Sequence, residues 1–160
     1  MQVFHTIAPV VDENSRILIL GSFPSVKSRE NGFFYGHPQN RFWKILSAVF
    51  EDELPITNEE KRAFLLRHRV AVWDVIASCE IQGSSDQSIK NAVPNDLSVI
   101  FKEAKIQRVF TNGGAATKLY QRYLEKQIGI TAIPLPSGSP ANAAWSLGAL
   151  IDAWQVIKKE

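Results

Sequence analysis

The sequence predicts an α/β fold, a three-layer αβα sandwich around a central, mostly parallel four-stranded sheet. Short apolar runs alternate along the chain with longer segments in which apolar residues recur at helical spacing. Strands that alternate with helices pair in parallel, because each crossover helix packs back onto the sheet. No break in composition and no repeat divides the 160 residues, so a single domain over 1–160 is expected.

The expected strands are short apolar runs bounded by glycine or polar residues, at 16–20, 70–73, 108–111 and 131–135. The first of them, RILIL, is too short for a helix and ends at Gly21. Pro134 cannot donate a hydrogen bond to a neighbouring strand, so the last strand is either weak or lies at an edge of the sheet.

The expected helices cover 41–50, 57–68, 115–125 and 140–158, and a further helix begins near Pro94, Asn95 and Asp96. In the first of these segments the apolar residues recur with the period of a helix. Thr57 and Glu60 have the spacing of a capping box, which marks the start of the second helix.

The overall composition excludes several classes of protein. A content of 45% hydrophobic residues, with four tryptophans and nine phenylalanines, is typical of a globular domain rather than a disordered one. No apolar run approaches the ~20 residues that a transmembrane helix needs, and the N-terminal segment lacks the pattern of a signal peptide. We therefore expect no membrane association and a cytoplasmic location.

Cysteine, histidine and charge limit the possible partners. Cys79 is the only cysteine, which excludes an internal disulfide or a four-cysteine cluster, and His5, His37 and His68 lack the spacing of metal ligands. We expect no metal and no other cofactor, and a monomer without an obligate protein partner. The net charge of +2 does not indicate nucleic-acid binding by itself, so any DNA footprint must be a local patch.

Unusual residues follow each predicted strand, in the segments 21–25, 73–74, 112–114 and 136–140. In parallel α/β sheets, ligands bind outside the carboxyl ends of the strands, where such segments meet. We therefore expect them to form one cleft. The first segment has neither a GxGxxG nor a GxxxxGK[ST] pattern, which disfavours a dinucleotide site or a P-loop.

The segment 31–43, NGFFYGHPQNRFW, gathers aromatic and polar side chains just before and within a predicted helix. Phe42 and Trp43 lie on the helical spacing, which favours the core. The residues ahead of the helix are expected in the cleft: Phe34, Tyr35, His37 and Asn40.

The segment 137–140, Ser-Gly-Ser-Pro, directly precedes the expected final helix. Free backbone N–H groups at the start of a helix attract anions, so this segment is expected to hold a DNA phosphate. Simple N-capping by Ser139 is the alternative explanation, and both can apply.

Three motifs together resemble the uracil-DNA glycosylase superfamily: HPQNRFWKIL at 37–46, GSFPS at 21–25 and LPSGSPANA at 135–143. The combination is most similar to the hypoxanthine-DNA (deoxyinosine) glycosylase family, and WDVIASC with the following GSSD adds to the likeness. The resemblance spans nearly the whole chain. It implies the fold of that superfamily and a monofunctional enzyme of base excision repair, which hydrolyses the N-glycosidic bond of a flipped-out hypoxanthine in damaged DNA.

The first motif departs from other branches of the superfamily. Mismatch-specific enzymes carry an asparagine there and uracil-specific enzymes an aspartate, whereas GSFPS has neither. The resemblance instead assigns the catalytic role to the asparagine of the HPxN segment, which is Asn40. Asn40 would orient the attacking water, and His37 would stabilise charge that develops on the leaving base.

The resemblance and the predicted cleft together imply two groups of binding residues. Those expected to contact the base are Gly21, Ser22, Phe23, Phe34, Tyr35, Trp73, Asp74 and Asn112. Those expected to contact the DNA strand are Ser25, Lys27, Arg41, Ser137, Gly138, Ser139, Pro140, Ala141 and Asn142.

Two other functions are compatible with the sequence. A glycosylase for uracil or thymine in G mismatches is favoured by HPQNRFW and disfavoured by GSFPS. A non-catalytic nucleotide-binding or DNA-binding module of the same fold would bind tightly without forming an abasic product, and Asn40 beside a glycine-rich loop disfavours it.

Overall fold

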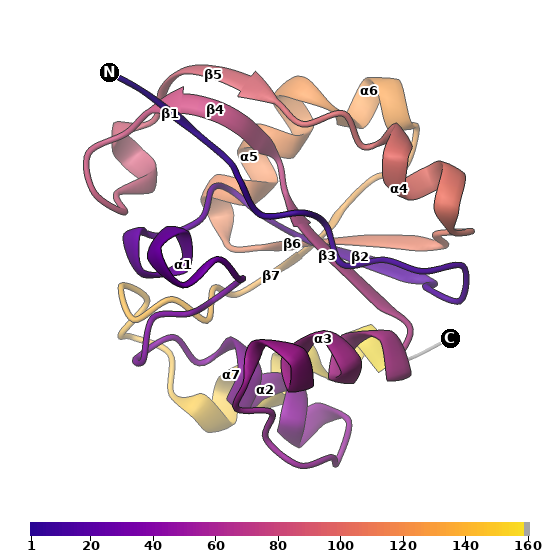
Figure 1. The fold of residues 1–160 in the computed structure, drawn as a ribbon. Coiled ribbons are helices and arrows are strands. Elements are labelled where there is room, and N and C mark those ends of the chain that lie inside the picture. The colour runs from indigo at the N-terminus through magenta and orange to yellow at the C-terminus, as the bar shows by residue number, and fades with distance from the viewer. Residues whose placement is uncertain (159–160) are drawn as a thin grey trace.

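The structure, a computed structural model, describes residues 1–158 and centres on a four-stranded parallel sheet. Its strands are ordered β3-β2-β6-β7, and helices cover both of its faces (Figure 1). The predicted three-layer α/β architecture is therefore confirmed. The strands are β2 (Ile17–Gly21), β3 (Val70–Asp74), β6 (Arg108–Asn112) and β7 (Ile133–Leu135).

Alternating side chains of β2 contribute to two hydrophobic cores, one on each face of the sheet. Ile17 and Ile19 belong to the core on one face, and Leu18 and Leu20 to the core on the other. The first face is covered by α2 (Phe42–Val49), α3 (Asn58–Arg67) and α7 (Leu147–Trp154), and the second by α4 (Ser98–Glu103), α5 (Gly114–Tyr123) and α6 (Glu125–Ile128).

Both edges of the parallel sheet are accounted for. The short strand β7, which contains Pro134, lies at one edge, as the proline predicts. At the other edge, Val10 and Val72 exchange two backbone hydrogen bonds of 3.0 Å, so a single bridge covers part of β3. This bridge anchors the N-terminal segment along the sheet.

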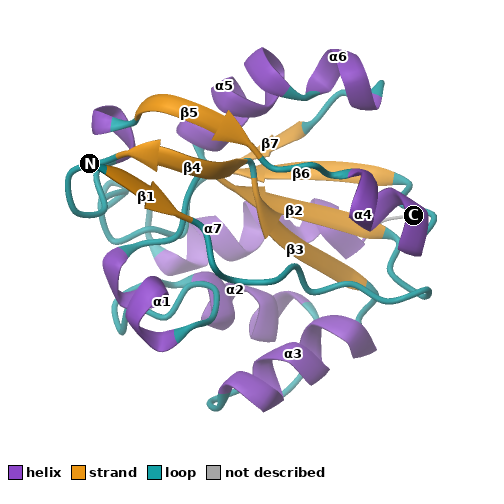
Figure 2. Ribbon diagram, turned by 45° about the horizontal axis from the view of Figure 1, so that its top comes forward, coloured by secondary structure: helices purple, strands orange, loops and turns teal. Residues whose placement is uncertain are grey.

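A second, antiparallel sheet was not predicted from the sequence. It consists of β1 (Gln2–Phe4), β4 (Ile76–Glu80) and β5 (Lys90–Pro94), in the order β1-β4-β5, and it packs beside α5 (Figure 2). The strands are short and mixed in polarity, and most of β5 is at least partly exposed, so none carries a clear apolar alternation. Pairing between residues far apart in sequence, such as Val3 with Cys79, stabilises them instead.

The predicted final helix over 140–158 is wrong in its first half. Helix α7 begins only at Leu147, after an N-cap from Ser146, and a short 3-10 turn, η2 (Gln155–Lys158), follows it. Residues 140–146 form turns instead, because the Arg41 side chain donates hydrogen bonds to carbonyl oxygens of this segment. The expected helix start at 137–140 is therefore absent, and so are a helix dipole and an N-cap at Ser139.

Other boundaries also differ from the predicted ones. Pro94 ends β5, and the helix expected there begins at Ser98. The helix predicted over 115–125 is divided into α5 and α6 at Leu124. Neither α1 (Val26–Asn31) nor the 3-10 turn η1 (Asp86–Ser88) was predicted.

None of the helices within residues 1–158 is both long enough and apolar enough to cross a membrane.

The capping box predicted at α3 is present. The Glu60 backbone N–H donates to the Thr57 hydroxyl at 3.1 Å, and the Thr57 N–H donates to the Glu60 carboxylate at 2.9 Å. We expect Thr57→Ala to lower the free energy of unfolding by about 1 kcal/mol and the melting temperature by roughly 2–4 °C. Thr57→Ser keeps the hydroxyl and is the matched control. Equal melting curves for Ala and wild type would contradict a stabilising cap.

Candidate active site

A cavity of about 300 Å³ opens at the carboxyl ends of the parallel strands, where the sequence predicts a cleft. Segments from six parts of the chain converge on it. The predicted site residues that line it are Gly21, Ser22, Phe23, Ser25, Phe34, Tyr35, His37, Asn40, Asp74, Asn112, Ser137, Ser139, Pro140 and Ala141.

The floor of the cavity follows from the register of three neighbouring strands. Gly21 at the end of β2 is directly opposite Asp74 at the end of β3. On the other side, Leu20 pairs with Thr111, so the next residue of β6, Asn112, lies beside Gly21. An acidic side chain, a glycine and an amide therefore form one row across the sheet.

Gly21 has no room for a side chain. A Cβ atom built at this position would lie 2.3 Å from the Asp74 Oδ1 oxygen and 2.9 Å from the Tyr35 hydroxyl. Glycine therefore allows two polar groups to come together over the end of β2. The GSFPS motif therefore begins with glycine because a side chain would not fit at this position, and not because of the backbone conformation.

Tyr35 presents a buried hydroxyl to the cavity. Its ring stacks on Phe42, with centroids 3.9 Å apart, and its φ of 52° is in the left-handed region. The hydroxyl finds no hydrogen-bond partner among residues 1–158. Burial raises the pKa of Tyr35 far above its ordinary range, and the charge of Asp74 adds to this effect, so the hydroxyl stays protonated. A ligand oxygen or nitrogen in the cavity would satisfy this donor.

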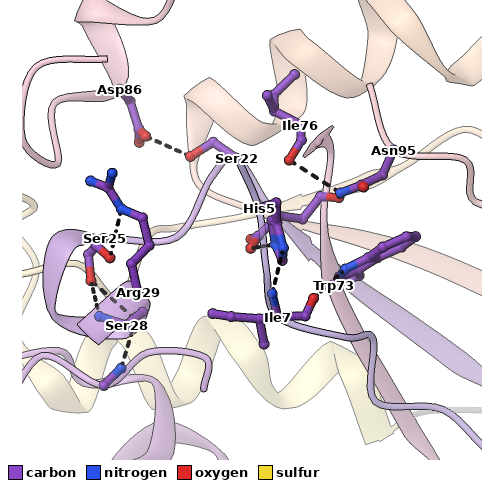
Figure 3. Close-up of polar contacts among 12 residues, drawn as sticks. His5, Ile7, Ser22, Ser25, Ser28, Arg29, Trp73, Ile76, Asp86 and Asn95 are labelled. Atoms are coloured by element: carbon purple, nitrogen blue, oxygen red, sulfur yellow. Dashed lines mark hydrogen bonds and ion pairs between the residues drawn. The ribbon is translucent and has the colours of Figure 1, made fainter. Parts of the chain in front are cut away.

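His5 forms a buried pair with Asp74, with 2.8 Å between His5 Nε2 and Asp74 Oδ2. The two side chains are only 2% and 4% exposed. The other ring nitrogen, Nδ1, accepts the Ile7 backbone N–H at 3.2 Å, as Figure 3 shows. In a neutral ring, Nε2 is therefore the nitrogen that donates a hydrogen bond to Asp74. Neither a site role for His5 nor this contact was predicted from the sequence, because the two partners are 69 positions apart.

Asp86 brings a second carboxylate to the cavity, from the turn η1. The Ser22 hydroxyl donates to Asp86 Oδ1 at 2.6 Å (Figure 3). Partial burial raises the pKa of Asp86, and the nearby Asp74 adds to this shift, although the Ser22 hydrogen bond opposes it. Ser28, Ser84 and Asp86 line the cavity but were not among the predicted site residues. The GSSD motif was the one available signal for the last two.

The amide of Asn112 is oriented by the loop that follows β7. Its Oδ1 oxygen accepts the Gly138 backbone N–H at 3.2 Å. The Nδ2 group is then the donor end of the side chain. The floor therefore combines an acceptor at Asp74 with donors at Tyr35 and Asn112.

Asn40 lines the cavity and lies one residue before Arg41, the N-cap of α2. Its Oδ1 oxygen accepts the Phe42 backbone N–H at 2.9 Å, so the side chain also makes a capping contact with the first residue of the helix. The same oxygen has a second lone pair with which it could hold a water. His37 lies one turn earlier, and its Nδ1 accepts the Gln39 backbone N–H at 3.0 Å, so the Nε2 atom is the remaining donor.

Arg41 holds the loop that precedes α7. Its guanidinium donates to the backbone carbonyl oxygens of Ser139, Asn142 and Trp145. The side chain of Asn142 also donates to the Ser137 carbonyl oxygen at 2.9 Å. Three of the five guanidinium N–H donors of Arg41 thus hold this loop in place, and the predicted contact of Arg41 with DNA stays a prediction.

Four further predicted site residues, like Arg41, do not line the cavity. Trp73 packs into both hydrophobic cores, and its indole N–H donates to the Ile7 carbonyl oxygen at 3.0 Å, so the prediction of a base contact is wrong for this residue. Lys27 lies on exposed α1 beside Glu30. Gly138 packs against α2, and Asn142 lies on the neighbouring surface. Contacts of these last three with DNA stay predictions.

Among residues 1–158, no group of three or more histidine, cysteine, aspartate or glutamate side chains is placed to hold a metal ion.

Comparison with known proteins points to one superfamily. Residues 8–158 match the model of the uracil DNA glycosylase superfamily. The chain is 33% identical over 135 residues to a protein named hypoxanthine DNA glycosylase from Methanosarcina barkeri, covering 84% of this chain and 85% of the relative. A protein of the same name from Methanosarcina acetivorans is 34% identical over 138 residues, covering 86% and 87%.

A solved structure gives the same result for the fold. The solution NMR structure of a candidate uracil DNA glycosylase from Methanosarcina acetivorans superposes with a TM-score of 0.80 at 29% identity, over 99% of this chain and 100% of the other. The class that the fold and the cavity define is thus a DNA glycosylase. The chain belongs to the uracil DNA glycosylase superfamily.

The crowding at Gly21 gives a test of the cavity floor. We expect Gly21→Ala to slow base release by tenfold or more, because the new methyl group displaces the Asp74 carboxylate. Overpacking of this kind commonly lowers stability by about 1–3 kcal/mol, so the variant should remain folded at assay temperature. Gly114→Ala is the matched control, since a Cβ atom there meets nothing within 4 Å. Wild-type rates of release by Gly21→Ala would show that the row of side chains is not part of the active site.

Proposed function

We propose that this DNA glycosylase releases hypoxanthine from DNA and thereby starts the repair of deaminated adenine. The observation that carries this proposal is the arrangement of hydrogen-bonding groups on the cavity floor. Asp74 offers an acceptor beside the donor groups of Tyr35 and Asn112. This set complements the ring N–H and adjacent C=O of a lactam, the edge that hypoxanthine presents. The names of the two Methanosarcina relatives support the same substrate.

The size and position of the cavity fit a single flipped base. A volume of about 300 Å³ is at the lower end of the range for small-molecule sites. A base within a duplex cannot reach such a cavity, so the nucleotide must rotate out of the stack. Phe23 and Phe34 line the cavity and are the aromatic rings available to stack on it.

Asn40 is proposed to orient the water that attacks the sugar. Cleavage of the N-glycosidic bond passes through a sugar with oxocarbenium character, which needs a well-placed water more than a strong base. A side-chain carbonyl oxygen already fixed by the Phe42 N–H is well suited to this task. The Nε2 donor of His37 can stabilise the negative charge that develops on the leaving base.

The loop over 137–142 and the start of α1 are proposed to hold the DNA backbone. Ser25, Ser137 and Ser139 lie on the rim of the cavity, and the hydrogen bonds from Arg41 keep the loop in place. Phosphate contacts by such groups make binding weaken as salt rises. Lys27 provides a positive charge on the exposed face of α1.

A panel of duplexes tests the substrate. We expect the wild-type protein to release hypoxanthine faster than uracil or xanthine, with cleavage of the strand at abasic sites as the readout and an adenine duplex as the control. Faster release of uracil from a G mismatch would favour the alternative of a mismatch-specific enzyme, which the missing asparagine or aspartate in GSFPS disfavours. Tight binding without any abasic product would favour a non-catalytic module.

Substitutions at Asn40 separate catalysis from capping. We expect Asn40→Ala to lower the single-turnover rate of hypoxanthine release by about 100-fold, while DNA binding stays within a few fold of wild type. The lost hydrogen bond to Phe42 should lower the free energy of unfolding by about 1 kcal/mol.

Asn40→Asp is the matched variant, because aspartate caps a helix as well as asparagine does. Its stability should equal that of the wild type, whereas its rate or its pH profile should change, since a negative charge replaces the amide beside the attacking water. Rapid single-turnover cleavage and thermal melts distinguish the two roles. Wild-type turnover by Asn40→Ala would refute the catalytic assignment.

A further inference from the structure

His5 connects the cavity to a segment outside the part of the chain that matches the superfamily, which begins at residue 8. The histidine follows β1, and its backbone N–H donates to the Ala77 carbonyl oxygen at 2.7 Å. The small antiparallel sheet therefore places the ring behind the end of β3. From there it reaches only one oxygen of Asp74, the one that is turned away from Gly21.

The hydrogen-bond direction in this pair is fixed by its surroundings. Because Nδ1 accepts the Ile7 N–H, the hydrogen of a neutral His5 ring must be on Nε2, which donates it to Asp74 Oδ2. The ring cannot rotate freely, since Phe23, Phe34 and Trp73 surround it with centroids 6.0–6.1 Å away. A nearly inaccessible carboxylate thus has a permanent donor on one oxygen.

The backbone of Asp74 is also held firmly. The buried amide of Asn95 donates to the Asp74 carbonyl oxygen at 2.9 Å and to the Ile76 carbonyl oxygen at 3.2 Å (Figure 3). Asp74 Oδ1 is consequently directed at the space over Gly21, inside the cavity. An ionised carboxylate oxygen in this position can accept a hydrogen bond but cannot donate one.

Deamination reverses the polarity of one ring nitrogen in a base. The N1 atom of adenine is an acceptor, whereas the N1 of hypoxanthine carries a hydrogen and is a donor; the N3 atoms of cytosine and uracil differ in the same way. An acceptor-only carboxylate therefore distinguishes a deaminated base from its parent. Guanine also carries an N1–H, so its exclusion must depend on its 2-amino group.

We propose that His5 is a positioning residue, whose Nε2–H holds Asp74 as an ionised acceptor for the ring N–H that deamination creates. This inference rests on the proposed function, since it requires a deaminated base in the cavity. It adds that selectivity against the parent base is produced by the His5–Asp74 pair. A protonated Asp74 could donate to the N1 of adenine, whereas the hydrogen bond from His5 favours the ionised form and fixes the orientation of the carboxylate.

Three groups face the Asp74 side chain from different elements. His5 approaches from the segment after β1, the Tyr35 hydroxyl from the loop before α2, and Asp86 from η1. Of these, Asp86 is a second carboxylate, and Tyr35 is a neutral donor. His5 is the one of the three that makes a hydrogen bond to the Asp74 carboxylate.

The test compares His5→Phe, which keeps a ring in the aromatic surroundings but removes the donor, with His5→Gln, which keeps a donor. For His5→Phe we expect hypoxanthine release at neutral pH to slow by about 10- to 100-fold, the scale for losing a group that orients a binding residue. The acid limb of its pH–rate profile should also move to higher pH, because a carboxylate without this hydrogen bond takes up a proton more readily. His5→Gln should restore most of the rate and the wild-type profile.

Two further variants make the result specific. His68→Phe removes a second histidine–aspartate pair, His68 with Asp52 at 2.7 Å, which lies away from the cavity, and it should leave the rate and the pH profile unchanged. In an Asp74→Ala background, His5→Phe should add little further loss, because the histidine acts through the aspartate.

The outcomes separate this inference from the proposed function. If the wild type releases none of the deaminated bases, the proposed function fails. If the wild type is active and His5→Phe releases hypoxanthine at the same rate, only the inference about His5 is overturned. Equal slowing by Phe and Gln with an unchanged pH profile would also overturn it, because that pattern indicates a purely structural histidine. Should His5→Phe melt below the assay temperature, His5→Leu, which is smaller and also lacks a donor, gives the same comparison.

Discussion

The parallel register of three strand ends is the constraint on which the rest of the site depends. Because β2 pairs in register with both β3 and β6, the residues that follow their apolar cores come together as Asp74, Gly21 and Asn112. The absence of a side chain at the middle position lets the two outer polar groups face one cavity. The Tyr35 hydroxyl reaches the same cavity from the loop before α2, and stacking of the Tyr35 ring on Phe42 holds it there.

This arrangement brings together polar groups that need a partner in the cavity. The buried Tyr35 hydroxyl finds no hydrogen-bond partner among residues 1–158, and leaving such a group unsatisfied would cost roughly 1–3 kcal/mol. The charge of Asp74 also lies close enough to disfavour ionisation of Asp86. His5 and Ser22 offset part of this by donating to one oxygen of each carboxylate. A base that supplies the missing partners would recover the remainder in its bound state.

Features that depend on residues close together in the sequence were predicted, whereas features that depend on residues far apart in the sequence were missed. Apolar periodicity located all four parallel strands, and Thr57 with Glu60 marked α3, because these signals are local. The antiparallel sheet was missed, since β1 and β5 form only through pairing with β4. The start of the final helix was misplaced because Arg41, about 100 residues earlier, fixes the turns before it. Most of the residues that line the cavity were predicted because they lie in local motifs. The role of His5 was not, because its partner Asp74 is 69 positions away.

The site's selectivity is better explained by polarity than by shape. A hydrophobic pocket discriminates poorly between two bases of nearly equal size, but a buried acceptor left without a donor is strongly unfavourable. Adenine and hypoxanthine differ mainly in which atoms of one edge carry hydrogen, so the penalty falls on the undamaged base. If Asp74 rejects the parent base on the floor, as proposed, the attacking water needs only orientation, for which a neutral amide such as Asn40 is sufficient. The proposal thereby assigns recognition and hydrolysis to different parts of the cavity, one built on the sheet and the other just before α2.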